Sequence, residues 1–122
     1  KEYVQEGDFH ERSGQMLTHL LLDLPKPPTA ILTANDICAF GAMRALQLRG
    51  YQAGKDVSVI GFDDISLASH WHPSLTTISQ PFRKIGFSLM HSLFSIISGE
   101  TNLPKTLVEP QLVLRQSTGS PT

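Results

Sequence analysis

Two kinds of apolar pattern alternate along the middle of the chain. Short β-branched runs bounded by turn residues predict buried strands, because they are too short for helices. These runs cover 29–34, 57–62 and 75–79. Longer segments rich in helix-forming residues predict helices at 36–49 and 82–98, ended by Gly50 and Gly99. A strand, a helix and a strand in this order predict parallel neighbours in one sheet.

The start of the chain gives weaker signals. Residues 2–6 are a candidate strand, and the spacing of Asp8 and Glu11 resembles a capping box at the start of a helix. One apolar face of this helix is predicted to contain Met16, Leu17, Leu20, Leu21 and Leu24. Pro25 would end the helix.

The segments after the second parallel strand are less regular. Residues 65–73 predict a short helical turn that carries Trp71. Residues 107–116 predict a final strand pair or a bent strand, broken at Pro110. The tail at 117–122 has the composition of a loop and is predicted to be frayed.

Polar residues follow the predicted parallel strands. Asn35 follows the first strand and Asp63 the second, and Asp8 follows the candidate strand at 2–6. Ligands of open α/β sheets bind at this carboxyl edge. Phe9 and Phe82 can supply apolar faces beside these groups. Carboxylate and amide groups next to aromatic rings suit a polyol or a sugar.

The composition and charge of the chain argue against several classes of function. The 122 residues suffice for one hydrophobic core, and their net charge of -1 without a basic cluster argues against a nucleic-acid-binding surface. No apolar run reaches the length of a membrane span. The single cysteine, Cys38, lies in an apolar helix and is interpreted as a small buried residue. The abrupt start, without an initiator Met, suggests a fragment.

The sequence lacks the residue patterns of several common catalytic and binding sites. The phosphate-binding glycine motifs, the G-x-S-x-G elbow and the C-x-x-C motif do not occur in the sequence. Asp63 and Asp64 could form the acid pair of a receiver domain, but Gln80 stands where such a domain needs a lysine. The alternative for this acid pair is capping of a helix or turn. His70 and His72 have no third ligand with metal-site spacing, so no metal or cofactor is expected.

Three runs of the sequence resemble one known family. They are EGDFHERSG, PTAILTANDICAFGAMRALQLRGYQAGKDVSVIGFDD and HPSLTTISQPFRKIG. In this order they strongly resemble the lactose/galactose-repressor (LacI/GalR) family of bacterial transcription regulators, over essentially the whole chain. The resemblance implies an α/β fold of the periplasmic-binding-protein type (type I), with three αβα layers and a parallel sheet.

The resemblance also implies a domain organisation. Residues 1–79 would form the C-terminal lobe of an effector-binding domain, and 80–99 a crossover helix that belongs to the N-terminal lobe in the intact protein. Residues 100–122 would be the return strand or strands and the tail. The DNA-binding helix-turn-helix, the hinge and most of the first lobe are expected to lie outside this sequence.

By the same resemblance, Asn35 and Asp63 would hydrogen-bond a small-molecule effector, expected to be a sugar or sugar derivative, and Phe9 and Phe82 would lie against it. The nearly all-round apolar helix at 36–49 needs a cover. Since this face makes the dimer in the family, Phe40, His70 and Trp71 are expected in a two-fold homodimer interface.

The resulting prediction is a cytoplasmic, effector-sensing segment of a repressor without enzyme activity, which would reach operator DNA only through a domain outside this sequence. The alternative is a periplasmic sugar-binding protein of the same fold, and an upstream helix-turn-helix or signal peptide would discriminate the two. A third possibility, an enzyme that modifies sugars, is disfavoured because the sequence shows no nucleophile and base at a catalytic spacing. Without the first lobe, the helix at 82–98 is expected to associate with a second copy through its apolar stripe.

Overall fold

The computed structural model describes residues 2–101 and 107–120, which form a mixed α/β fold around one four-stranded sheet. The strands are β1 (Ala30–Leu32), β2 (Ser58–Asp63), β3 (Thr76–Ser79) and β4 (Gln111–Val113), in this order across the sheet. β1, β2 and β3 are parallel, and β4 pairs with β3 in the antiparallel sense. The helices are α1 (Glu11–Leu22), α2 (Asp36–Leu48), α3 (Ser66–His70) and α4 (Phe82–Ile97).

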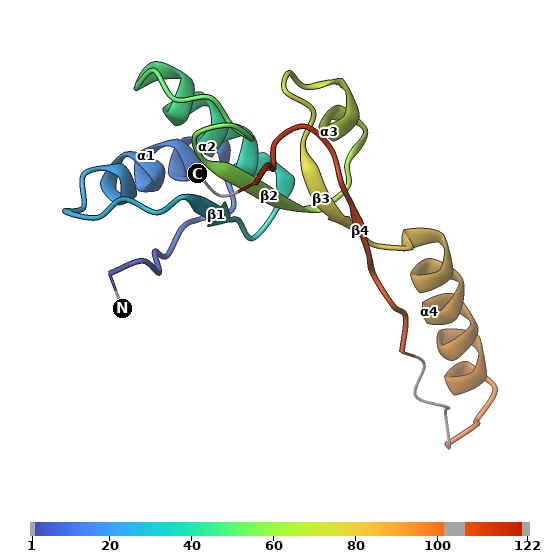
Figure 1. Cartoon of the computed structure of the whole chain (residues 1–122). Helices are drawn as coiled ribbons and strands as arrows, with labels where there is room; N and C mark the ends of the chain where they lie inside the picture. The colour runs from blue at the N-terminus through green and yellow to red at the C-terminus, as the bar shows by residue number, and fades with distance from the viewer. Residues whose placement is uncertain (1, 102–106, 121–122) are drawn as a thin grey trace.

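The predicted parallel strands and the two longer helices are confirmed. α2 begins at the N-cap Asn35, and the chain leaves it through Gly50, which has a φ of 79°. α1 and α2 pack side by side on one face of the sheet (Figure 1). The core between α2 and the sheet includes Leu46, Val59 and Leu75, each with an exposed fraction of 0%. No helix in the described ranges meets the length and hydropathy needed to cross a membrane.

The expected strand at 2–6 and the capping box are wrong. Residues 2–8 form a turn and irregular structure, and α1 has His10 as its N-cap without a side-chain cap. Phe9 has a φ of 66°, so the chain turns sharply between Asp8 and the helix. As a result, Oδ1 of Asp8 accepts a hydrogen bond from the His10 amide at 3.1 Å. Asp8 therefore stabilises a turn and does not follow a strand.

The predicted apolar face of α1 is also wrong in part. Met16 and Leu20 are exposed, whereas the buried face consists of Ser13, Gly14, Thr18, Leu21 and Leu22. Small residues occupy this face because the two helix backbones touch. A Cβ atom on Gly14 would overlap the carbonyl of Cys38, and one on Gly41 would overlap the carbonyl of Glu11.

The C-terminal segment forms one strand, and its tail is more ordered than expected. Pro110 directly precedes β4, and the described residues before it, 107–110, are not a strand. Ser117 is fully buried: its hydroxyl donates to the Val59 carbonyl at 2.6 Å and accepts from the Thr76 amide at 2.8 Å. The prediction of a frayed tail is therefore wrong at Ser117. Residues 121–122 lie outside the described residues.

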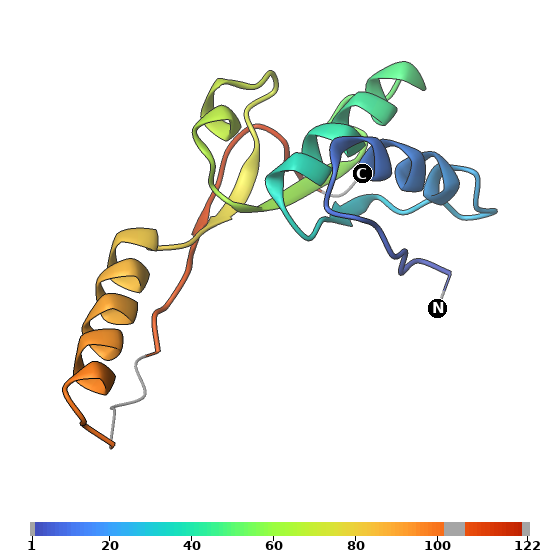
Figure 2. The same cartoon turned by 180° about the vertical axis from the view of Figure 1, so that it is seen from behind.

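α4 projects away from the sheet, and β4 runs back alongside its connection to β3 (Figures 1 and 2). The helix is present as predicted, but most of its apolar side chains face solvent. Phe87, Phe94 and Ile97 are exposed to 75%, 62% and 71%. Association through this helix remains a prediction.

The contact between α1 and α2 gives a first testable prediction. Gly41→Ala should lower the free energy of unfolding by about 1–3 kcal/mol, because the added methyl group forces the helix backbones apart. Gly86→Ala in α4 is the matched control: a Cβ there meets no atom within 4 Å, and alanine favours a helix by roughly 1 kcal/mol. Denaturant unfolding followed by circular dichroism measures both. Equal effects of the two substitutions would contradict the proposed backbone contact.

Candidate functional site

The ends of the parallel strands bring the candidate polar residues to one edge of the sheet. Leu32 of β1 is paired with Ile60 of β2. Asp63 is the last residue of β2, and Asn35 lies three residues after the end of β1, so both lie at the carboxyl ends of neighbouring parallel strands. Asp63 is in turn paired with Ser79 of β3. Both residues therefore lie at the carboxyl edge of the parallel sheet, and their role in ligand binding stays a prediction.

Asn35 links this edge to Phe9. Its Oδ1 accepts a hydrogen bond from the Cys38 amide at 2.8 Å and caps α2, while its Nδ2 donates to the Phe9 carbonyl at 3.0 Å. The bond holds the chain segment before α1 beside the end of β1. The Phe9 ring is 63% exposed. Asn35 thus fixes an exposed aromatic residue next to the edge.

Asp63 is held from the side of β3. Its Oδ1 accepts a hydrogen bond from Nε2 of Gln80 at 2.8 Å, and both side chains are partly buried. Phe82 begins α4 two residues after Gln80, and its ring is 55% exposed. Gln80 therefore links the carboxylate of Asp63 to the chain segment that leads into α4.

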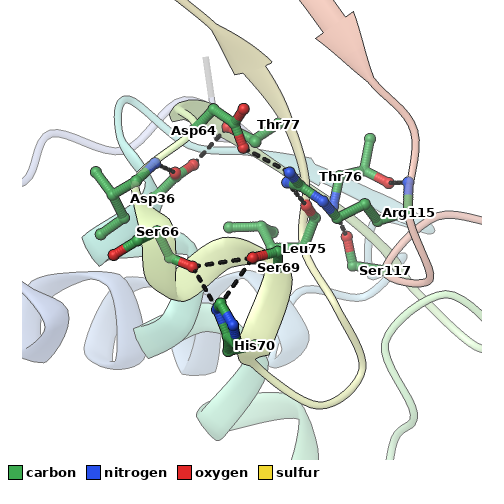
Figure 3. A network of polar contacts seen from close by, with 11 residues as sticks. Asp36, Asp64, Ser66, Ser69, His70, Leu75, Thr76, Thr77, Arg115 and Ser117 are labelled. Atoms are coloured by element: carbon green, nitrogen blue, oxygen red, sulfur yellow. Dashed lines mark hydrogen bonds and ion pairs between the residues drawn. The ribbon is translucent and has the colours of Figure 1, made fainter.

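Asp64 forms an ion pair and does not cap a helix or turn. Its Oδ1 lies 2.7 Å from Nη2 of Arg115, which follows β4 (Figure 3). Nη1 of Arg115 donates to the Leu75 carbonyl at 2.8 Å. Asp63 and Asp64 have φ values of 112° and 56°, both in the left-handed region of backbone conformation, which residues other than glycine rarely adopt. The capping interpretation is therefore wrong for both acids.

The capping carboxylate at this edge belongs to Asp36. Its exposed fraction is 0%, and it accepts hydrogen bonds from the Thr77 hydroxyl at 2.5 Å and the Ile65 amide at 2.9 Å (Figure 3). Burial raises the pKa of Asp36, while both hydrogen bonds oppose the rise. A Cβ on Gly61 would overlap this carboxylate. Asp36 is thus a buried structural group.

Of the residues expected at a dimer interface, Phe40 is already covered within its own chain. Phe40 is only 3% exposed, because Trp71 of the same chain stacks on it with ring centroids 4.7 Å apart. The expectation that Phe40 needs a second subunit as cover is therefore wrong. Trp71 remains partly exposed and lines an open hollow of about 450 Å³ with Met43 and Arg44. His70 is exposed, and its Nδ1 lies 2.8 Å from the Ser66 carbonyl.

Metal-ligating side chains and the Cys38 thiol are further reactive groups of the chain. No group of three or more His, Cys, Asp or Glu side chains within residues 2–101 and 107–120 could hold a metal ion. Cys38 is buried, as predicted, and burial raises the pKa of its thiol.

Two further residues at this edge were not predicted from the sequence. Gln80 follows β3 as Asp63 ends β2, so the strand-end rule could have included it. Arg115 gave no such signal, because it lies 51 residues from Asp64 and follows the antiparallel strand β4.

The chain matches a known protein family. The model of the periplasmic binding protein-like domain matches residues 1–118. The chain is 37% identical over 118 residues to the HTH-type transcriptional repressor CytR of Escherichia coli (strain K12), and 39% identical over 117 residues to the lactose operon repressor of the same strain. These alignments cover 96% of this chain but 35% and 32% of the two repressors. The chain thus spans about a third of their length.

Solved structures give the same result. The Lac repressor dimer bound to operator and the anti-inducer ONPF has a TM-score of 0.87 at 39% identity, over 94% of this chain and 40% of that chain. The complex of the transcriptional regulator CelR with cellobiose has a TM-score of 0.87 at 34% identity, over 96% and 36% of the two chains. The chain therefore belongs to the periplasmic-binding-protein-like domain family, and its relatives are LacI-family transcriptional repressors.

The buried carboxylate gives a second prediction. A folded-state pKa raised above the ordinary 3.8 means that Asp36 contributes most to stability below this value and loses that contribution as the pH rises through the raised pKa. Asp36→Asn keeps the shape but does not titrate. The unfolding free energy of the wild type minus that of the variant should therefore fall as the pH rises from below 3.8 towards neutral. Each tenfold difference in proton affinity between the folded and unfolded states contributes about 1.4 kcal/mol to this fall. Urea titrations across this range measure it, and a constant or rising difference would contradict the assignment.

Proposed function

We propose that this chain is the effector-sensing and dimerisation segment of a cytoplasmic bacterial transcriptional repressor, without enzyme activity. The observation that carries the proposal is the position of Asn35 and Asp63 at the carboxyl ends of the neighbouring parallel strands β1 and β2. This edge is where open α/β folds bind small ligands. The repressors among the chain's relatives support a regulatory role.

The groups at this edge suit a sugar-like effector. A carboxylate has about four acceptor positions, so Asp63 can accept from ligand hydroxyls while it also accepts from Gln80. Asn35 has a second amide N–H besides the one donated to Phe9. The exposed rings of Phe9 and Phe82 offer apolar surfaces for the faces of a sugar ring. One relative was solved in complex with cellobiose, which is itself a sugar.

Sensing requires that the effector binds one conformation of the repressor more tightly than another. We propose that residues 1–79 form one lobe and that α4, within 80–99, packs in the other lobe of the intact repressor. That lobe would cover the apolar side chains of α4, while residues 100–122 return the chain to the first sheet. Effector binding between the lobes would then change their closure and, through it, the affinity of a separate DNA-binding domain for operator DNA.

A thermal-shift screen of the full-length repressor against sugars, sugar phosphates and nucleobases tests this function. Asp63→Ala should weaken binding of any hit from the screen about tenfold or more, because unpaired buried polar groups cost about 1–3 kcal/mol. Operator binding should persist. Asp23→Ala is the control, since it breaks an exposed ion pair with Arg49. Unchanged affinity in Asp63→Ala, measured by calorimetry, would disprove the role of Asp63.

The dimer interface gives a separate prediction. We propose that His70 and Trp71 lie in a two-fold homodimer interface, with Phe40 beneath Trp71 as its support. Trp71→Asp should convert the full-length repressor to monomers, as measured by light scattering, because a charge would be buried between the subunits. Met16→Asp introduces the same charge at an exposed position of α1 and should leave the dimer intact. A dimeric Trp71→Asp variant would show that the interface lies elsewhere.

A further inference from the structure

Two residues, one on either side of α4 in the sequence, contact the acid pair at the end of β2. Gln80 lies between β3 and α4, and its amide donates to Asp63 at 2.8 Å. Arg115 lies on the returning segment just after β4, and its guanidinium is paired with Asp64 at 2.7 Å. The segment that leaves β3 for α4 and the segment that returns to β4 run side by side in both views (Figures 1 and 2).

Arg115 is itself held in place by other bonds. Its Nη1 donates to the Leu75 carbonyl at 2.8 Å, and its backbone amide donates to the Thr76 hydroxyl at 2.8 Å. The side chains of Arg115 and Asp64 are exposed to only 18% and 21%. The ion pair of Arg49 with Asp23 has the same length of 2.7 Å, but these side chains are 38% and 60% exposed. Limited exposure weakens solvent screening, and the planar guanidinium donates to two partners at once.

The acid pair needs such a restraint because of its backbone. Asp63 and Asp64 are consecutive non-glycine residues with positive φ, a conformation that persists only where surrounding contacts enforce it. The pair with Arg115 is the side-chain contact that fixes Asp64. Because Asp64 follows Asp63 directly, its backbone sets the direction in which the end of β2 presents the Asp63 carboxylate.

We propose that Arg115 is a positioning residue: through Asp64 it holds the left-handed backbone at the end of β2 and so aims the Asp63 carboxylate into the effector site. The proposal rests on the proposed function only in that Asp63 meets the effector. Arg115 also follows the strand that returns from α4, so a shift of this strand would redirect the carboxylate. The same contact therefore joins the effector site to the lobe that would contain α4.

Hydrogen exchange of the full-length repressor without effector tests the restraint. Arg115→Met should accelerate exchange of the amides of 62–66 about tenfold or more, while the amides of α2 keep their wild-type rates. Arg115→Lys should restore part of the protection, since it keeps the charge but loses the fork of two donors. Arg49→Met is the matched control and should leave 62–66 unchanged. Wild-type exchange of 62–66 in Arg115→Met would overturn the proposal.

Asp64→Asn covers the case in which Arg115→Met fails to fold. Asparagine tolerates the left-handed conformation, so this variant removes the charge without adding strain. It should accelerate the same amides, and the double variant Asp64→Asn with Arg115→Met should exchange no faster than the faster single variant. Additive acceleration would show that Arg115 acts on the turn by another route and would overturn the proposal.

The second measurement, ligand binding, tests whether Arg115 aims the Asp63 carboxylate into the effector site. D-galactose, D-xylose, lactose, cellobiose, adenosine and cytidine are the probes, titrated by calorimetry at a temperature at which each variant is folded. A probe that binds the wild type should bind Arg115→Met about tenfold more weakly and Arg49→Met equally well. Equal binding by Arg115→Met would overturn the aiming role. If no probe binds the wild type, the proposed function loses its support for these effectors, whereas the exchange experiment still decides the restraint.

Discussion

The buried carboxylate of Asp36 fixes the edge of the sheet on which the proposed function depends. It lies in the first turn of α2, where the helix dipole favours a negative charge, and it accepts from β3 through Thr77 and from the start of α3 through Ile65. These two hydrogen bonds make its burial tolerable, because a buried charge needs partners in good geometry. Since Gly61 of β2 packs directly on this carboxylate, Asp36 ties two helices and two strands together just below Asp63.

The backbone contact between α1 and α2 positions the other side of the site. Gly14 and Gly41 allow the two helices to approach so closely that the backbone carbonyl opposite each glycine leaves no room for a Cβ atom. The segment before α1 is thereby held against the start of α2, where Asn35 binds the Phe9 carbonyl. Helix packing thus fixes the side of the edge that carries Asn35 and Phe9, and the Asp36 hydrogen bonds fix the side that carries Asp63. The candidate site depends on both.

Local pattern predicted much of the fold and part of the site. The β-branched runs identified β1, β2 and β3, and the strand-end rule then placed Asn35 and Asp63 together. The same reasoning failed in part for α1, because it counted only large apolar residues, whereas the buried face also uses the small residues Ser13, Gly14 and Thr18. It also failed for Phe40, since an apolar helix face does not reveal whether its cover comes from the same chain. Arg115 could not be predicted, because an ion pair across 51 residues leaves no trace in local sequence.

A crystal structure of the full-length repressor with the tightest ligand from the effector screen tests the central claim most directly. We expect ligand hydroxyls to contact the side chains of Asn35 and Asp63, with a ring face against Phe9 or Phe82. A ligand bound instead in the hollow lined by Met43, Arg44 and Trp71, with the carboxyl edge of the sheet free, would contradict this claim.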